Sequence, residues 1–100
     1  MAKDFDINNL SGVDKIADSL LNFESSIQSE MEAELLTGQE LNLEEARRLA
    51  LNNDLEGVAN EIAKNQKVLN VFATGNRIQQ EAIAKSMGMS RDEMANMIVE

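Results

Sequence analysis

The 100-residue chain contains no cysteine, histidine, proline, tryptophan or tyrosine, and its only aromatic side chains are three phenylalanines. Without Cys and His there is no disulfide, no zinc site of the usual ligand types and no Cys or His nucleophile paired with a base. No apolar run approaches the roughly 20 residues that span a bilayer, and the first ten residues lack the apolar segment of a signal peptide. These absences exclude many enzyme mechanisms and favour an intracellular or virion setting over secretion.

Positive charge is also scarce, because nine Lys and Arg stand against 18 Asp and Glu, for a net charge of −9. Contacts to phosphate groups need cations or dipoles, so nucleic acids and anionic membranes are poor partners for the whole chain. The acidity by itself indicates a well-solvated surface.

The first third of the chain predicts a lead-in and one long helix. Residues 1–11 are polar and irregular, so we expect a flexible segment, with Ser11 capping the helix that follows. Apolar residues then recur every three or four positions, which is typical of a helix over 12–37 that ends at Gly38. The early part of this stripe is close to a coiled-coil seam. It predicts self-association through Val13, Ile16, Leu20, Phe23 and Ile27.

Residues 38–100 predict a compact bundle of four to five short helices, so the expected fold class is all-α. The spacing of Asn42 and Glu45 resembles a capping box, Asp54 is a second cap, and Ser90 with Glu93 forms a box of the usual type. Residues 42–64 read as a three-helix-like unit and 76–99 as a helix-turn-helix-like pair. The segment 65–76 is either a short helix or an apolar tether. No segment alternates as a strand does.

The last helix pair, Gln79 to Ile98, has the small residues and turn glycine of a helix-turn-helix. A recognition helix reads base edges with Arg, Lys, Asn and Gln. Only Arg91 and Asn96 suit that task here, and three nearby acids repel phosphate. A structural helix pair is therefore favoured over DNA binding. Methionines cluster in the same region and predict either a partner groove or an adaptable core; they are Met87, Met89, Met94 and Met97.

Two groups of charged side chains are candidates for chemistry. Glu30, Glu32 and Glu34 are followed by three more glutamates at 40, 44 and 45, and such carboxylates can serve acid–base catalysis or bind divalent cations. Residues two apart on a helix point to different faces, so a solvated acidic face is favoured. Arg47 and Arg48 predict pairing with Glu44 or with acids on a neighbouring helix, or else a partner patch. We expect no catalytic residue, metal ligand or cofactor site.

Two stretches resemble known families. Residues 34–64 contain Leu36-Thr37-Gly38 followed by Leu41, Ala46, Leu49, Asp54 and Val58, and are similar in outline to ubiquitin-associated-like domains, such as the first domain of elongation factor Ts. Glu40 departs from that pattern, which has glycine there. The match covers about a third of the chain.

The second resemblance spans about residues 34–98. The block LLTGQELNLEEARRLALNNDLEGVANEI, followed by NRIQQEAIAKSMGMSRDEMANMI, is similar to a segment of tail tape-measure proteins of tailed bacteriophages. Asn53 replaces the glycine of that family's Gly-Asp-Leu turn. The resemblance implies a virion structural role in tail assembly, without catalysis, in the virion or the cytoplasm of an infected bacterium.

The sequence thus predicts a non-enzymatic structural or assembly module with protein partners or self-association. A ubiquitin-associated-like or helix-turn-helix-like protein-binding adaptor is the alternative. A DNA-binding regulator is the third candidate, and the charge opposes it.

Overall fold

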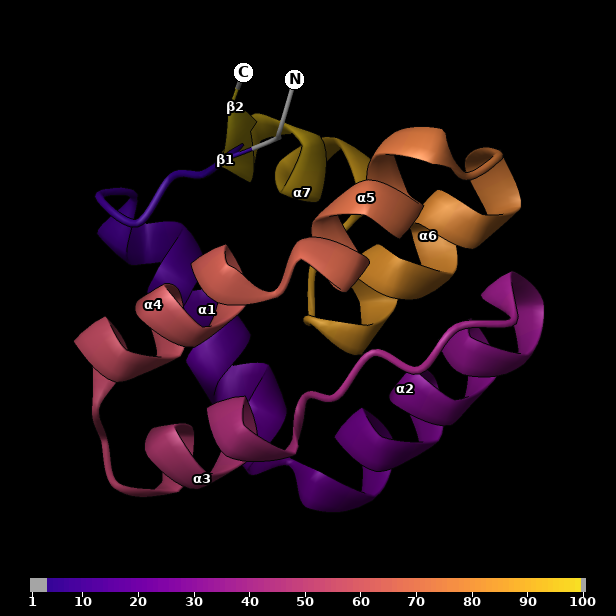
Figure 1. Ribbon diagram of the computed structural model, residues 1–100. Coiled ribbons are helices and arrows are strands. Elements are labelled where there is room, and N and C mark those ends of the chain that lie inside the picture. The colour runs from indigo at the N-terminus through magenta and orange to yellow at the C-terminus, as the bar shows by residue number, and fades with distance from the viewer. Residues whose placement is uncertain (1–3, 100) are drawn as a thin grey trace.

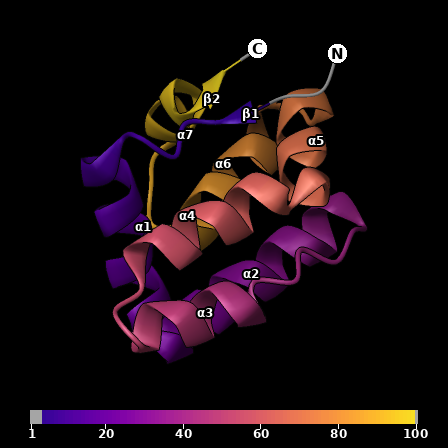
Figure 2. The same ribbon diagram turned by 60° about the vertical axis from the view of Figure 1, so that its left-hand side comes forward.

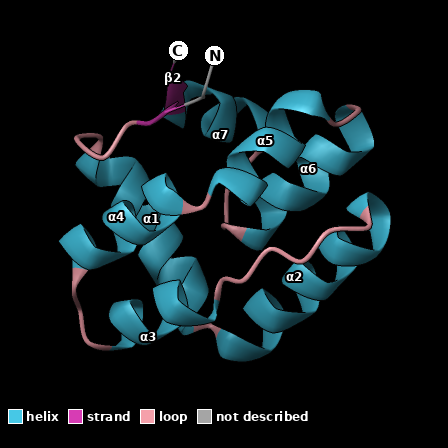
Figure 3. Ribbon diagram, viewed as in Figure 1, coloured by secondary structure: helices cyan, strands magenta, loops and turns pink. Residues whose placement is uncertain are grey.

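The computed structural model describes residues 4–99, which form seven helices and a small two-stranded sheet (Figures 1 and 3). In chain order the elements are β1 (Asp4–Phe5), α1 (Leu10–Leu21), α2 (Phe23–Thr37), α3 (Glu44–Leu51), α4 (Leu55–Lys64), α5 (Gln66–Thr74), α6 (Arg77–Ser86), α7 (Arg91–Met97) and β2 (Ile98–Val99). The predicted helical fold class is therefore confirmed, apart from the two short strands.

The sheet joins the two ends of the described chain. β1 and β2 are antiparallel, with Asp4 opposite Val99 and Phe5 opposite Ile98, and the Asp6 N–H donates to the Met97 carbonyl at 2.7 Å. Phe5 is buried. The prediction of a flexible lead-in is thus wrong for residues 4–11, and residues 1–3 lie outside the described part. Two-residue strands are too short to produce an alternating pattern, so the sequence could not reveal them.

The predicted single helix over 12–37 is two helices, because the chain leaves the helical conformation at Asn22 (φ −85°, ψ 79°). The Asn22 N–H donates to the Ser19 carbonyl and closes α1, while the Asn22 carbonyl accepts from Ser26 and opens α2. The first helix also begins earlier than expected. Its cap is the Asn9 side chain, which accepts from the Gly12 N–H at 3.2 Å, and Ser11 lies inside the helix.

Most of the other predicted helix ends are confirmed. Gly38 ends α2 with φ 71°, Asp54 accepts from the Gly57 N–H at 2.9 Å, and Ser90 and Glu93 form the predicted capping box. Asn42 does not cap α3. It has φ 58°, in the left-handed region, and Leu43 is the residue before the helix.

Residues 42–76 form three helices, α3, α4 and α5. Residues 42–64 contain two helices, α3 and α4, rather than three. The ambiguous segment 65–76 is mostly the helix α5, whose cap Asn65 accepts from the Val68 N–H.

The core lies between α1 and the later helices. Helices α3 and α4 both pack on α1, whereas α2 packs mainly on α6 (Figure 2). The turn between α6 and α7 also reaches α1, because the Gly88 backbone (φ 73°) lies against the side chain of Ser19. Buried residues of β1, α6 and α7 thus belong to the same apolar cluster as those of α1.

Candidate protein-docking surface

Helix α2 turns its apolar side chains outward. Its buried residues are Ser26, Glu30 and Ala33. Four large apolar residues at four-residue intervals face solvent instead, and we call them the outward stripe: Phe23 (43% exposed), Ile27 (46%), Met31 (57%) and Leu35 (84%). An amphipathic helix of a globular domain normally buries such a stripe. A contiguous exposed apolar patch of this kind marks an interaction site more often than single exposed residues do.

The helix break at Asn22 divides the predicted self-association seam between two environments. Val13, Ile16 and Leu20 of α1 are fully buried in the core, so they cannot meet a second copy while the chain is folded. The predicted interface is wrong for these three residues. Phe23 and Ile27, beyond the break, remain accessible.

The predicted methionine groove is also absent. Met87, Met89, Met94 and Met97 are all buried, so the adaptable-core interpretation fits and the groove interpretation does not. Met97, for example, packs over Gly12 of α1, where a side chain would collide with it.

A groove runs along the outward stripe, between α2 and α3. Residues 41–47, which lead into α3, run antiparallel to α2, because Ser26 pairs with Arg47, Glu30 with Leu43 and Glu34 with Leu41. The groove has a volume of about 680 Å³. We call it the α2–α3 groove; its apolar lining residues are Phe23, Ile27, Met31 and Leu51. Ile27 and Met31 also line a second, adjacent depression on α2, together with Leu35.

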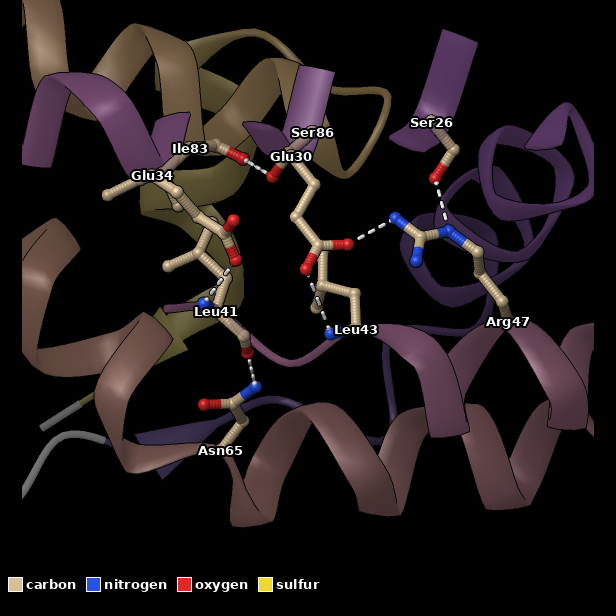
Figure 4. A network of polar contacts seen from close by, with 9 residues as sticks. All are labelled: Ser26, Glu30, Glu34, Leu41, Leu43, Arg47, Asn65, Ile83 and Ser86. Atoms are coloured by element: carbon tan, nitrogen blue, oxygen red, sulfur yellow. Dashed lines mark hydrogen bonds and ion pairs between the residues drawn. The ribbon is translucent and has the colours of Figure 1, made fainter. Parts of the chain in front are cut away.

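The floor of the groove is a buried ion pair (Figure 4). Arg47 of α3 pairs with Glu30 of α2, and both side chains are about nine-tenths buried. Arg47 Nε also donates to Ser26 Oγ at 3.0 Å, and the other Glu30 oxygen accepts from the Leu43 N–H at 3.4 Å. A buried charge is costly unless it is paired and hydrogen-bonded, and here each charge has both kinds of partner.

A second set of contacts fixes the connection between α2 and α3. Glu34 accepts from the Leu41 N–H at 2.9 Å, and Asn65 Nδ2 donates to the Leu41 carbonyl at 2.6 Å (Figure 4). Leu41 and Leu43 are themselves buried. The groove wall formed by residues 38–43 is therefore held by both polar and apolar contacts.

Sequence reasoning placed Glu30 and Glu34 on a solvated acidic face, and for Glu30 that prediction is wrong. It left open whether Arg47 pairs with Glu44 or with an acid on a neighbouring helix, and the structure selects the neighbouring helix. The sequence contains one sign that Glu30 is buried against a partner. Glu30 lies four residues after Ser26 and three before Ala33, on a face of α2 whose large apolar residue is Phe23 in the first turn.

Negative charge surrounds the groove. Glu24, Glu40 and Glu44 are exposed, and within the described residues none of them forms an ion pair with a Lys or Arg. The nearby cations already have partners. Lys85 Nζ lies 3.8 Å from Glu32, and Arg48 pairs with Glu45 on its own helix.

The pair of Arg48 and Glu45 also leaves its mark on the pKa values of both groups. The hydrogen bond from Arg48 lowers the pKa of the Glu45 carboxyl below its ordinary value, and the same bond raises the pKa of Arg48. Both side chains are thus held in their charged forms, and Arg48 adds little free positive charge to the rim of the groove.

The C-terminal helix pair offers less to a ligand. The exposed residues of α7 include Asp92, Glu93 and Asn96, and Arg91 is partly covered, with one of its nitrogens 3.4 Å from Gln80 Oε1. Among residues 4–99, no group of three or more acidic side chains is placed to hold a metal ion. None of the helices described has the length and apolarity to cross a membrane.

The outward stripe and the glutamates beside it are therefore the best candidate for a protein-docking surface. The evidence for this docking surface comes from the structure alone. No protein-family model, curated protein or solved structure matches the chain.

Proposed function

We propose that the chain is a structural or assembly module that holds another protein against the outward stripe of α2. The observation that carries this proposal is the orientation of α2, which exposes Phe23, Ile27, Met31 and Leu35 and buries Ser26, Glu30 and Ala33. Helix-in-groove recognition between proteins typically uses the apolar face of a helix.

The kind of assembly we propose is that of a bacteriophage tail. The support is the resemblance of residues 34–98 to a segment of tail tape-measure proteins. The outward stripe adds an independent reason for an assembly role, because an apolar surface that serves no core contact is costly in solution unless a partner covers it.

The two other functions weighed from the sequence have weaker support. A ubiquitin-associated-like adaptor would need a three-helix domain over 34–64, and that segment contains α3, α4 and only the last turn of α2. A DNA-binding regulator would need cations on α7, whose exposed residues include two acids in its first turn.

A photo-crosslinking side chain at Met31 tests the proposal in host cells that express the gene. Its matched control is the same side chain at Leu10, which is also strongly exposed and apolar but lies at the start of α1. We expect a discrete crosslinked protein from position 31 and none of that size from position 10. If neither position, or both equally, yields that product, the docking role is contradicted. If the product is a host protein foreign to virions, the tail-assembly proposal fails.

A further inference from the structure

We infer that the occupant of the α2–α3 groove is a basic amphipathic helix of another protein, a partner with an apolar stripe flanked by Lys or Arg. This inference rests on the proposed docking function and names its partner. Shape and charge lead to it independently.

The shape of the surface fits a helix. The outward stripe spans 13 residues from Phe23 to Leu35, and the 12 steps between the two ends correspond to about 18 Å of helix or about three turns. Its members lie four residues apart, and rows at that spacing are the ridges that pack into the grooves of a crossing helix. The opposite wall of the groove offers Leu51 at the far end of α3, so a partner helix would contact apolar groups on two sides.

The charge around the groove requires a basic occupant. Glu40 and Glu44 line the groove and Glu24 lines the adjacent depression on α2. Within the described residues none of these three carboxylates has an ion-pair partner, while the neighbouring Arg47 and Arg48 are already paired with acids. Lys or Arg beside the partner's apolar stripe would meet these carboxylates, and such complementarity both attracts and orients a partner.

A second copy of this chain fits less well. A two-fold dimer brings the same patch of each copy together, so the free glutamates of one rim would face those of the other. Each chain has a net charge of −9, and among the residues that the structure describes the cations lining the groove, Arg47 and Arg48, are already paired, so they do not offset the repulsion.

The test uses the intact chain and two helical peptides of about 16 residues, roughly 24 Å long as helices. Both peptides carry leucines at positions i, i+3, i+4 and i+7, and they differ only in having Lys or Glu at the flanking positions. Binding is followed by shifts of backbone amide signals in NMR spectra. We expect the Lys peptide to shift signals of α2 and residues 38–51 with a Kd below about 100 μM, and the Glu peptide to cause no shift.

Variants separate apolar from electrostatic recognition. Ile27→Gln with Met31→Gln should weaken binding of the Lys peptide at least about tenfold, because both side chains line the groove, whereas Leu10→Gln, on α1, should leave it unchanged. Replacing Glu24, Glu40 and Glu44 together by Gln should weaken it about fivefold at low salt and by less at high salt.

Each other result overturns a defined part of the account. Equal binding of both peptides at the groove would leave the docking function intact and overturn the basic occupant. Self-association that Ile27→Gln with Met31→Gln abolishes, without binding of the Lys peptide, would identify a second copy as the occupant. Shifts spread over the whole surface, or binding unaffected by that double variant, would overturn the inference and the docking function together.

Discussion

Helices α1 and α2 are adjacent in sequence and carry one uninterrupted apolar stripe, yet they bury opposite kinds of residue. In α1 the stripe faces the core, with Val13, Ile16 and Leu20 buried. In α2 the stripe faces solvent, and the buried face is built on Ser26 and Glu30. Asn22 separates the two, and the chain leaves the helix there.

The difference teaches that periodicity predicts a helix without predicting which face the fold covers. The inner face of α2 packs mainly on α6, with Ala33 in the apolar core, and polar contacts also hold it to α3: Glu30 pairs with Arg47, and Arg47 Nε donates to Ser26. A helix attached by hydrogen bonds and a buried ion pair can leave its large apolar residues outside.

The polar attachment of α2 can be broken most severely at Arg47. Arg47→Met leaves Glu30 buried without its counter-charge, and such a change costs about 3–5 kcal/mol of unfolding free energy. Glu30→Gln together with Arg47→Met removes the stranded charge and keeps an acceptor for the Leu43 N–H, so it should recover part of the loss. Urea unfolding measures both. A double variant no more stable than Arg47→Met alone would contradict the ion-pair explanation.

The apolar attachment of α1 is tested by matched truncations of leucine. Leu20→Ala removes a fully buried side chain and should cost about 3 kcal/mol, because it loses burial and leaves a cavity. Leu35→Ala on α2 removes a side chain that is 84% exposed and should change stability by less than about 0.5 kcal/mol. Thermal or urea unfolding of the two variants compares them directly. Equal losses would mean that Leu35 packs as Leu20 does.

Two glycines sharpen the comparison, since both adopt positive φ. An alanine at Gly38, at the end of α2, would meet nothing within 4 Å and should cost only the backbone strain, about 1 kcal/mol. An alanine at Gly88 carries the same strain and also collides with Ser19 of α1, so it should cost about 2–3 kcal/mol. The difference in urea midpoint between the two variants isolates the contact with α1. If Gly38→Ala lowers the urea midpoint more than Gly88→Ala does, the close contact of the α6–α7 turn with α1 is contradicted.

The surface ion pair between Lys15 of α1 and Glu93 of α7 should affect the stability of the fold at acidic pH. The hydrogen bond from Lys15, and then that from the Ser90 backbone, hold the pKa of the Glu93 carboxyl below its ordinary value of 4.5. A lowered folded-state pKa contributes stability above the ordinary value, and this contribution is lost as the pH falls through the folded-state pKa. Glu93→Gln should therefore reduce the loss of stability below about pH 4.5, and Lys15→Met should do so in part. Unchanged acid unfolding curves for both variants would contradict this ion pair.

Local signals in the sequence were enough to predict several helix ends, but not the packing of α2. Gly38, Asp54 and Ser90 act within three or four residues, so their roles follow from nearest neighbours. Asn42 has the same spacing and fails, because a cap needs an extended backbone and Asn42 is left-handed. The partner of Glu30 is 17 residues away. No short-range pattern distinguishes such an acid from one in solvent, and the apolar steps across Asn22 conceal the break.

The outward stripe itself gives the most direct test of the account. Ile27→Gln, Met31→Gln and Leu35→Gln together replace three apolar side chains by a residue that also favours helices. The free energy of unfolding of this triple variant, measured in urea, should stay within about 1 kcal/mol of the parent chain, because exposed side chains contribute little to folding. A loss of several kcal/mol would show that the fold buries these residues, and the docking surface on α2 would not exist.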